Sequence, residues 1–402
     1  MNFKRLRALA MLAVTLMAVV PAAAQKFAIL SDLHVVPGNP NDGKLREAVA
    51  EVNRSDADAV LITGDLTKDG ERVSHDMLVN RWLKPMEQRG IRVFVIPGNH
   101  DVNNPHAKVY DGNNTERCAT VSATDFATIY HDYGYGEAIA RDAQSLSYVV
   151  QLDSKTRLIA VDACEYENND FDKDICVTAG RIKPATMAFI KAQADEAHRQ
   201  GMEVMMMMHH GIVSHFGWQD RVMKDYLVDH WRREARKIAR MGIKVCFTGH
   251  FHAQDISRKY GLTDMETGST VSYPHPYRLI EIDTQRGALS VKTEHVSELG
   301  SMKDSQETLQ QKSERFANSA LSSVMESMTP KKVPADVKQE CGKVLGEAYA
   351  MHLAGDEHPT ADFTARLKTA TKHLKRYSWK WAFIMKRIGR YLSTDTGVED
   401  NT

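Results

Sequence analysis

Short apolar runs alternate with longer segments of helical periodicity between residues 25 and 298. The runs are three to six residues long and end at polar residues, as buried strands do. Strands that alternate with helices predict an α/β fold with a mainly parallel sheet. The helices expected between these strands cover residues 44–52, 73–86, 184–200 and 221–241.

Four other apolar runs form two pairs, and no helical pattern separates the two runs of a pair. They cover residues 146–152 with 157–161, and 277–282 with 289–292. Such close spacing predicts antiparallel hairpins. We expect these hairpins to form a second sheet that packs face to face on the first, with helices outside.

The composition changes near residue 298, and no strand pattern follows. The remaining helical segments cover 306–328, 335–353, 361–374 and 379–392, separated by Pro330, Pro334, Gly355 and Pro359. Proline and glycine at these points are typical of helix ends. We therefore expect two domains, an α/β domain over 25–298 and a helical domain over 305–395.

The first 24 residues have the pattern of an export signal. Lys4, Arg5 and Arg7 precede the apolar stretch 8–20, and the small residues 22–24 suit cleavage before Gln25. An uncleaved membrane anchor is the less favoured alternative, because the apolar stretch is shorter than the roughly 20 residues that a membrane span needs. We expect a periplasmic or secreted protein, cleaved near Ala24.

The charge of the chain bears on its partners, and its cysteines bear on disulfide formation. Lysine plus arginine and aspartate plus glutamate each number 52, so nothing favours bulk nucleic acid as a partner. After export, Cys164 and Cys176 either form a bridge around the polar loop between them or stay as free thiols. Cys246, in an apolar run, is expected in the core. The oligomeric state is not indicated.

Five of the apolar runs end in residues that bind metals. The side chains concerned are carboxylates, an amide and imidazoles, a ligand set that suits manganese, iron or zinc. Since residues two apart on an extended segment point the same way, each Asp-x-His or His-x-His pair can face one cavity. The motifs are Asp32 and His34, Gly64-Asp65, Gly98-Asn99-His100-Asp101, His209-His210 and Gly249-His250-Phe251-His252.

The order of these motifs resembles the calcineurin-like metallophosphoesterase superfamily over residues 26–292. Residues 101–105, 145–148, 267–269 and 273–278 make the chain similar to bacterial cyclic-nucleotide phosphodiesterases with a helical C-terminal extension. The resemblance implies an α/β fold: a four-layer sandwich of two packed mixed sheets flanked by helices, plus a helical C-terminal domain. It also implies hydrolysis of phosphate esters.

The resemblance implies two divalent or mixed-valence metal ions (Mn, Fe or Zn). One ion is expected on Asp32, His34 and His252. The other is expected on Asn99, His209 and His250, with Asp65 bridging the two. Taken alone, Asp65 after a glycine is more typical of a helix N-cap.

The remaining residues of these motifs have expected roles outside the ligand set. The resemblance makes His100 the residue that contacts the phosphate and protonates the leaving oxygen, with Asp101 orienting its imidazole. His210 is either a neighbour of the metal site or the ligand itself, and the resemblance favours His209, because the family uses the first residue after the strand.

Residues that contact the substrate are harder to predict, because loops determine them. The candidates are Asn103, Asn104, His215, His275, Tyr277 and Arg278. Arg278 either binds a phosphate or pairs with an internal carboxylate. Tyr273 and Tyr277 either stack on a base or pack in the fold.

We expect an exported phosphodiesterase, with cyclic nucleotides as the first choice of substrate. A phosphomonoesterase, a nucleotidase or a diesterase for phospholipid-derived esters would use the same site. A non-catalytic metal-dependent binding module is the alternative from another class. The basic, aromatic segment 366–390 is expected to pack on the α/β domain, and a weak membrane-surface contact is its alternative.

Overall fold

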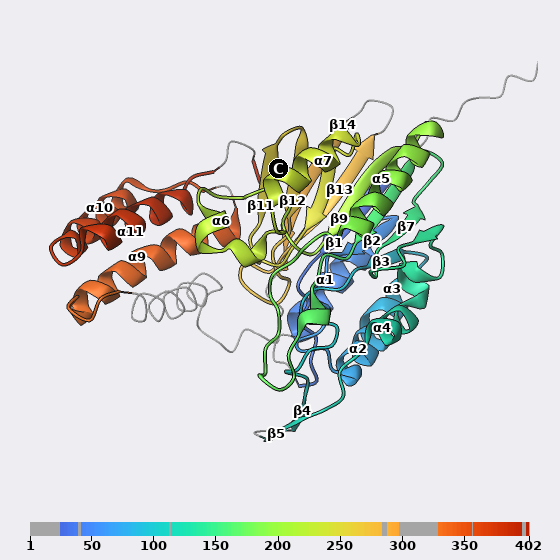
Figure 1. Cartoon of the computed structure of the whole chain (residues 1–402), viewed down its shortest axis with the longest axis horizontal. Coiled ribbons are helices and arrows are strands. Elements are labelled where there is room, and N and C mark those ends of the chain that lie inside the picture. The colour runs from blue at the N-terminus through green and yellow to red at the C-terminus, as the bar shows by residue number, and fades with distance from the viewer. Residues whose placement is uncertain are drawn as a thin grey trace, which may run out of the picture.

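The computed structural model describes residues 25–38, 42–111, 114–283, 288–296, 329–355, 357–395 and 399–401. Its main body is a pair of sheets packed face to face, and the C-terminal helices project from one side of this body (Figure 1). The predicted export signal and the predicted helix over 306–328 lie outside the described residues, as does the expected boundary at residue 305.

The first sheet has five strands in the order β14-β13-β1-β2-β3. Its three parallel members are β1 (Gln25–Leu30), β2 (Ala59–Ile62) and β3 (Arg92–Val95). The hairpin of β13 (Pro276–Asp283) and β14 (Ala288–His295) joins the same sheet, because β13 pairs antiparallel with β1. The expectation that this hairpin belongs to the second sheet was therefore wrong.

The second sheet has seven strands in the order β11-β12-β10-β9-β8-β7-β6. Its central strands run parallel and its edge strands pair antiparallel, so both sheets are mixed. The strands are β6 (Ala140–Arg141), β7 (Tyr148–Gln151), β8 (Thr156–Val161), β9 (Glu203–Met208), β10 (Val245–Thr248), β11 (Asp255–Lys259) and β12 (Leu262–Glu266).

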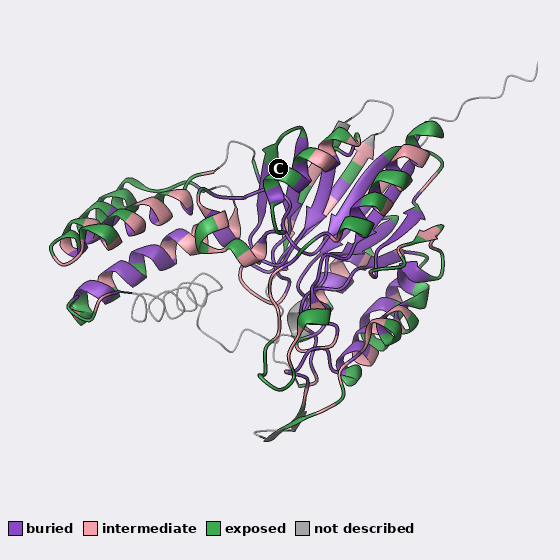
Figure 2. Ribbon diagram, viewed as in Figure 1, coloured by how far each residue is buried: buried purple, intermediate pink, exposed green. Residues whose placement is uncertain are grey.

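The methionine-rich strand β9 shows how the layers are packed. Met205 and Met207 face the core between the two sheets, whereas Met206 and Met208 face a second core under the outer helices. Alternate residues of a strand point to opposite faces, so a strand that is buried on both sides can be apolar throughout. Figure 2 shows both sheets buried between helices whose outer faces are exposed.

Helices cover the outer face of each sheet, which completes the predicted four-layer sandwich. On the first sheet lie α1 (Asp42–Arg54), α2 (Arg72–Leu78) and α3 (Lys84–Glu87), with a π-helical turn Val79–Leu83 between the last two. On the second lie α5 (Pro184–Arg199) and α7 (Trp231–Arg240). The sequence did not predict helix α4 (Ala123–Ile129), the hairpin of β4 (Lys108–Asp111) and β5 (Asn114–Arg117), or the strands β6, β11 and β12.

The single helix expected over 221–241 is interrupted. It consists of α6 (Gln219–Val222), a 3₁₀ turn Lys224–Tyr226 and then α7. His230 precedes α7 with φ of 56°, in the left-handed region that a continuous right-handed helix cannot include. Tyr226 ends the 3₁₀ turn, and its ring centre lies 4.6 Å from that of His250.

The C-terminal region is helical, as predicted, with boundaries close to those expected. It contains α9 (Ala335–Ala354), α10 (Ala361–Lys375) and α11 (Trp379–Tyr391). These helices share a third core with Phe216 and Phe251 of the sandwich, in which Leu367 and Leu374 are buried. The basic segment thus packs on the rest of the protein, although Trp379 keeps 73% of its surface exposed.

Candidate metal centre

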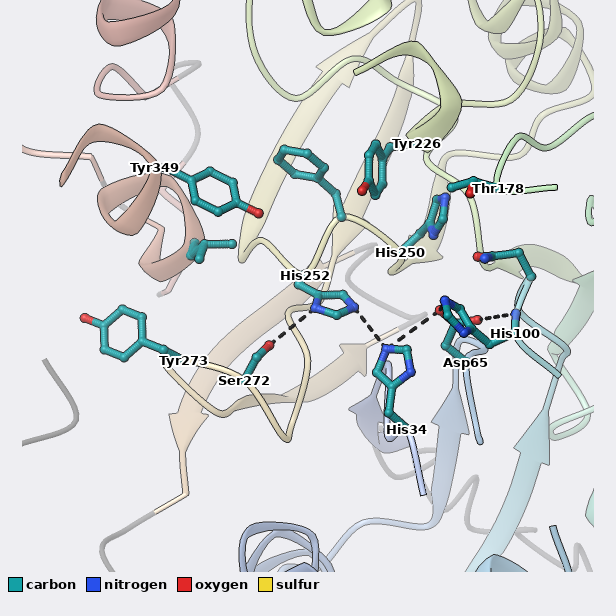
Figure 3. Close-up of a pocket in the computed structure, with 13 residues that line it drawn as sticks. His34, Asp65, His100, Thr178, Tyr226, His250, His252, Ser272, Tyr273 and Tyr349 are labelled. Atoms are coloured by element: carbon teal, nitrogen blue, oxygen red, sulfur yellow. Dashed lines mark hydrogen bonds and ion pairs between the residues drawn. The ribbon is translucent and has the colours of Figure 1, made fainter. Parts of the chain in front are cut away.

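The five predicted motifs meet at one edge of the sandwich. Those after β1, β2 and β3 come from the first sheet, and those after β9 and β10 come from the second. Figure 3 shows His34, Asp65, His100 and His250 from these motifs close together. Since these strands are parallel within each sheet, their carboxyl ends lie together. Residues from 32 to 252 are thereby brought around one cavity.

The first group of ligand-type atoms belongs to Asp32, His34, Asp65 and His252, and these atoms lie within 4.8 Å of one another. His34 Nε2 is 3.2 Å from His252 Nε2, which is itself 3.2 Å from Asp32 Oδ1. Apart from this His252 nitrogen, that buried carboxylate oxygen has no hydrogen-bond partner among the described residues. Such a convergence of lone pairs needs a cation, so these residues fit a metal ion.

The second group consists of Asp65, His209 and His250, again with ligand-type atoms within 4.8 Å of one another. His209 Nε2 lies 3.4 Å from Asp65 Oδ1 and 3.2 Å from Asn99 Oδ1. His209 Nδ1 donates to the Thr63 carbonyl at 2.8 Å, which leaves the Nε2 lone pair for a metal. Asp65 belongs to both groups, as expected of a bridging carboxylate.

The geometry favours His209 over His210 as the ligand. His210 Nε2 donates to the Thr178 carbonyl at 2.9 Å, and its ring packs against His250 with 4.5 Å between ring centres. His210 is in neither group of ligand-type atoms. Its position is that of a residue that supports His250.

The backbone of the expected ligands is strained. Five of them have positive φ, a conformation that costs a residue with a side chain about 1–3 kcal/mol and that persists only when the surroundings impose it. These residues are Asp32 (51°), His34 (43°), Asp65 (48°), His250 (76°) and His252 (61°). The strain therefore accumulates where the metal ligands are, as it does at functional sites.

Three glycines allow the loops to approach one another. A Cβ at Gly64, where φ is 99°, would lie 2.6 Å from His209 Nδ1. A Cβ at Gly98 would overlap the Asp65 carboxylate, and one at Gly249 would overlap the Ser31 hydroxyl. The glycines of the motifs are thus required by the close packing around the ligands.

Asp65 is an ionised carboxylate that both groups of ligands share. Burial by itself would raise the pKa of Asp65, but the positive charges of His209 and His100 outweigh it and hold the pKa well below its usual value. For His34, burial is the largest effect and lowers the pKa to about 4. Metal binding requires an ionised carboxylate and neutral imidazoles. Burial opposes the charged form of His209, but Asp65 outweighs it and raises the pKa of His209 to about 9, so a metal here has to displace that proton.

His100 lies at the rim with 35% of its side chain exposed, and Nε2 is 4.0 Å from Asp65 Oδ2. Its Nδ1 donates to the Lys68 carbonyl at 2.5 Å and lies 3.7 Å from Asp69 Oδ1. Burial opposes the charged form, but Asp65 and Asp69 outweigh it and raise the pKa of His100 to about 10. Asp69 was not predicted from the sequence, where it carries no motif.

The expected role of Asp101 was wrong. Its carboxylate does not orient the His100 ring but accepts hydrogen bonds from the backbone N–H groups of Leu66 (3.1 Å), Thr67 (2.8 Å) and Gly98 (2.8 Å). Burial is the main reason that the pKa of Asp101 is raised to about 7, and the charge of Asp65 adds to it. Asp101 thus ties the loop after β2 to the loop after β3.

A cavity of about 330 Å³ opens in front of the ligands. Figure 3 shows Tyr226, Tyr273 and Tyr349 around it, on the side away from Asp65. Phe251 and Leu353 complete this wall, which we call the aromatic wall. Tyr349 and Leu353 belong to α9, so the helical region contributes to the cavity, which the sequence did not predict.

Most of the predicted substrate contacts lie elsewhere. Arg278 is fully buried and donates to Thr293 Oγ1 (3.1 Å), to the Glu266 carbonyl (2.9 Å) and to the Asp400 carbonyl. His275 Nδ1 contacts the Thr270 carbonyl at 3.1 Å. Tyr277 packs in the core between the sheets.

The other residues predicted to contact the substrate also lie outside the cavity, where they contact the rest of the fold. Asn103, with φ of 49°, accepts a hydrogen bond at its carbonyl from Asn169. Asn104 is buried and donates to the His100 carbonyl at 3.0 Å, which stabilises the loop after β3. His215 is fully buried beside Asp255. None of these residues lines the cavity.

Cys164 and Cys176 are free thiols. Each donates to the loop after β3, Cys164 to the Pro97 carbonyl and Cys176 to the Asn99 carbonyl, both at 3.4 Å. Burial raises the pKa of Cys176 to about 12. Of the two alternatives for this pair, the structure has the unbridged one, and Cys246 is buried as expected.

The sequence profile of the calcineurin-like phosphoesterases matches residues 25–254, and the chain belongs to that family. The family uses two divalent metals, and the two groups that share Asp65 fit them. Fold and site together define a metal-dependent phosphoester hydrolase. No curated protein sequence matches the chain.

Solved structures with similar folds share little sequence with this chain. A dimetal phosphatase from Danio rerio has 12% identity and a TM-score of 0.49, covering 69% of this chain and 98% of its own. A putative 5'-nucleotidase from Staphylococcus aureus has 12% identity and a TM-score of 0.43, covering 71% and 56%. A purple acid phosphatase from yellow lupin (Lupinus luteus) has 12% identity and a TM-score of 0.43, covering 69% and 52%.

None of the helices among the described residues is long and apolar enough to cross a membrane.

Proposed function

We propose that this protein is an exported phosphodiesterase that uses two metal ions to hydrolyse small phosphate esters, most of all cyclic nucleotides. The observation that carries the proposal is the position of Asp65, whose two oxygens face His34 at 3.8 Å and His209 at 3.4 Å. A carboxylate shared by two groups of ligands is the arrangement that holds a metal pair.

The metal ions, when bound, supply a hydroxide nucleophile near neutral pH and neutralise charge on the phosphoryl oxygens. The chain supplies the proton for the leaving oxygen. Because Nδ1 of His100 donates to the Lys68 carbonyl, its Nε2 is the atom that can hold the transferable proton at the cavity. Asp69, 3.7 Å from Nδ1, favours the protonated ring even after cations have neutralised Asp65.

The aromatic wall supports a substrate with a planar group. Tyr226 and Phe251 lie with their ring centres 4.9 Å apart, and those of Phe251 and Tyr349 are 5.9 Å apart. Such a surface opposite the ligands can contact a nucleobase while the phosphate lies on the metals. The volume of about 330 Å³ suits a small ester rather than a polymer.

Turnover of a substrate panel by the metal-reconstituted protein tests this proposal. The panel contains 3′,5′- and 2′,3′-cyclic nucleotides, linear diesters, glycerophosphodiesters and nucleoside monophosphates. We expect the highest kcat/KM for a cyclic nucleotide. A higher value for monophosphates would make the protein a nucleotidase, and no turnover of any ester with two metals bound would leave a binding module.

Export rests on the predicted signal. The expected result is a mature protein that begins at Gln25 in the periplasmic or secreted fraction of a bacterial host. Mass spectrometry of the purified N-terminus measures this directly. A chain that keeps residues 1–24 and stays with the cells would contradict cleavage.

A further inference from the structure

A second set of metal-ligand side chains lies away from the cavity, where the helical region meets β11. Asp255, His352 and Glu357 are buried and offer ligand-type atoms within 4.8 Å of one another. Glu357 also belongs to a neighbouring group with Asp395 and Asp400. We call these five residues the junction cluster. None of them is among the residues that line the cavity.

Two atoms of the cluster are buried without a hydrogen-bond partner among the described residues. They are Glu357 Oε2 and His352 Nε2, in side chains that are only 1% exposed. His352 Nδ1 contacts Glu357 Oε1 at 2.6 Å, so the remaining nitrogen and oxygen are the atoms left over. A buried polar atom without a partner costs about 1–3 kcal/mol, and more when it is charged. The cluster therefore has ligand atoms that the protein itself does not satisfy.

The junction cluster also has more carboxylates than cationic side chains. Its members are four acids and one imidazole, His352. The nearby His215 contacts Asp255, but it also lies 3.3 Å from Asp264 and 3.2 Å from Glu266. Its positive charge is therefore divided among three carboxylates. Buried carboxylates are stable when they are paired or coordinate a cation. In the buried group of Asp255, His352 and Glu357, one imidazole faces two carboxylates, and this balance points to a bound cation.

The cluster joins segments that are distant in sequence. The Gln254 N–H, just before β11, donates to the Leu353 carbonyl at the end of α9 at 3.2 Å. Asp400 accepts a hydrogen bond from the Ile256 N–H at 2.6 Å. A Cβ at Gly355, where φ is 74°, would overlap the Gln254 carbonyl, so the chain between α9 and α10 is held close to β11. A cation here would fasten the helical region to the sandwich.

We propose that the junction cluster binds a third divalent metal ion, separate from the catalytic pair. The imidazole of His352 together with the carboxylates of Asp255 and Glu357 suits Mn²⁺ or Zn²⁺, whereas Ca²⁺ prefers oxygen ligands alone. This ion links β11 to α9 and to the C-terminal end of the chain. It thereby fixes the helix that carries Tyr349 and Leu353 into the cavity.

The test is the metal content of the full-length protein after loading with Mn²⁺ or Zn²⁺ and dialysis against metal-free buffer. We expect three ions per chain in the wild type and two in Glu357→Gln, which removes a ligand but keeps the shape. Asp65→Asn disrupts the catalytic pair but not the junction cluster, so we expect it to keep one tightly bound ion. The two sites are thus tested independently.

Glu340→Gln is the matched control. Glu340 contacts His373 Nδ1 at 2.8 Å, the same kind of pair as Glu357 with His352, but this pair is about one-third exposed and belongs to none of the four groups of ligand-type residues. We expect the control to keep three ions. Two ions in the wild type together with two in Glu357→Gln would overturn the proposal.

Anomalous diffraction from wild-type crystals grown with Mn²⁺ gives an answer that does not depend on the folding of a variant. The expected result is a peak between Asp255, His352 and Glu357 in addition to peaks at the catalytic pair. Peaks at the catalytic pair alone would overturn the junction site and leave the proposed function intact. If only Ca²⁺ gives occupancy there, the Mn²⁺ or Zn²⁺ assignment is wrong.

Discussion

The sandwich and the helical region contribute to one cavity by different structural means. The sandwich supplies the metal ligands from loops whose backbone is strained, with φ of 51° at Asp32 and 48° at Asp65. The helical region supplies Tyr349 and Leu353 from the regular helix α9. A strained loop has to be held by the core beneath it, whereas a residue on a helix needs only that the helix be docked. Reaction chemistry and substrate preference should therefore respond to different substitutions.

The largest effect is expected from Asp65→Ala, which removes the carboxylate shared by both groups. We expect loss of paired metal and a fall in turnover of more than about 1,000-fold, because the metals supply several kcal/mol of charge stabilisation. Metal analysis and steady-state kinetics measure both. Asp76→Ala, at the exposed pair with Arg72, is the control. Normal kcat with two tightly bound metals would show that Asp65 is no bridge.

His100→Asn should lower kcat while the metals remain bound. Loss of a general acid typically costs about 100- to 10,000-fold. The loss should be much smaller for an ester with nitrophenolate as leaving group, which needs little protonation. If the loss is the same for all leaving groups, His100 binds the phosphate without donating a proton.

Gly98→Ala tests whether close packing imposes the strained geometry. The added Cβ would overlap the Asp65 carboxylate, so we expect weaker metal binding and a loss of about 1–3 kcal/mol in stability. In the control Gly201→Ala, φ is 68° and no atom lies within 4 Å of the new Cβ. The control should cost stability through backbone strain alone and leave metal content unchanged. Full metal binding by Gly98→Ala would contradict the packing argument.

Tyr349→Ala tests the contribution of the helical region. We expect roughly a fivefold rise in KM for cyclic nucleotides, since an aromatic contact is worth about 1 kcal/mol beyond its buried area. For a small ester without a base, kcat/KM should change little. Trp379→Ala, on α11 and mainly exposed, is the control. An equal effect on both substrates would show that Tyr349 stabilises the cavity and does not select the base.

The smallest expected effect is on binding to a membrane surface. Trp379 and Phe383 are 73% and 49% exposed, and basic residues lie on the same helix. We expect weak binding to vesicles with anionic lipids, and a severalfold loss of binding in the double variant Trp379→Ala/Phe383→Ala, with no change in kinetics. Sedimentation with vesicles measures this. Equal binding by the variant would remove the membrane contact from consideration.

The sequence alone determined the strands that carry the metal-ligand motifs and the residue types of the metal centre. Motifs such as Asp32-Leu33-His34 and His250-Phe251-His252 follow apolar runs directly, and parallel strands must bring such ends together. The helices of the C-terminal region were predicted within a few residues, because proline, glycine and periodicity are local signals. Family resemblance added the division of the ligands between two metals.

Only the tertiary structure decided which sheet β13 and β14 join, since a hairpin pattern does not indicate which other strand the hairpin pairs with. The same holds for Asp101, which bonds to backbone N–H groups while Asp69 lies beside His100. Arg278 is buried and Tyr349 reaches the cavity through contacts between segments far apart in the chain. Local patterns predict strands, helices and the types of metal ligand. Contacts across the fold depend on how the layers pack, and the periodicity of a single sequence does not predict that packing.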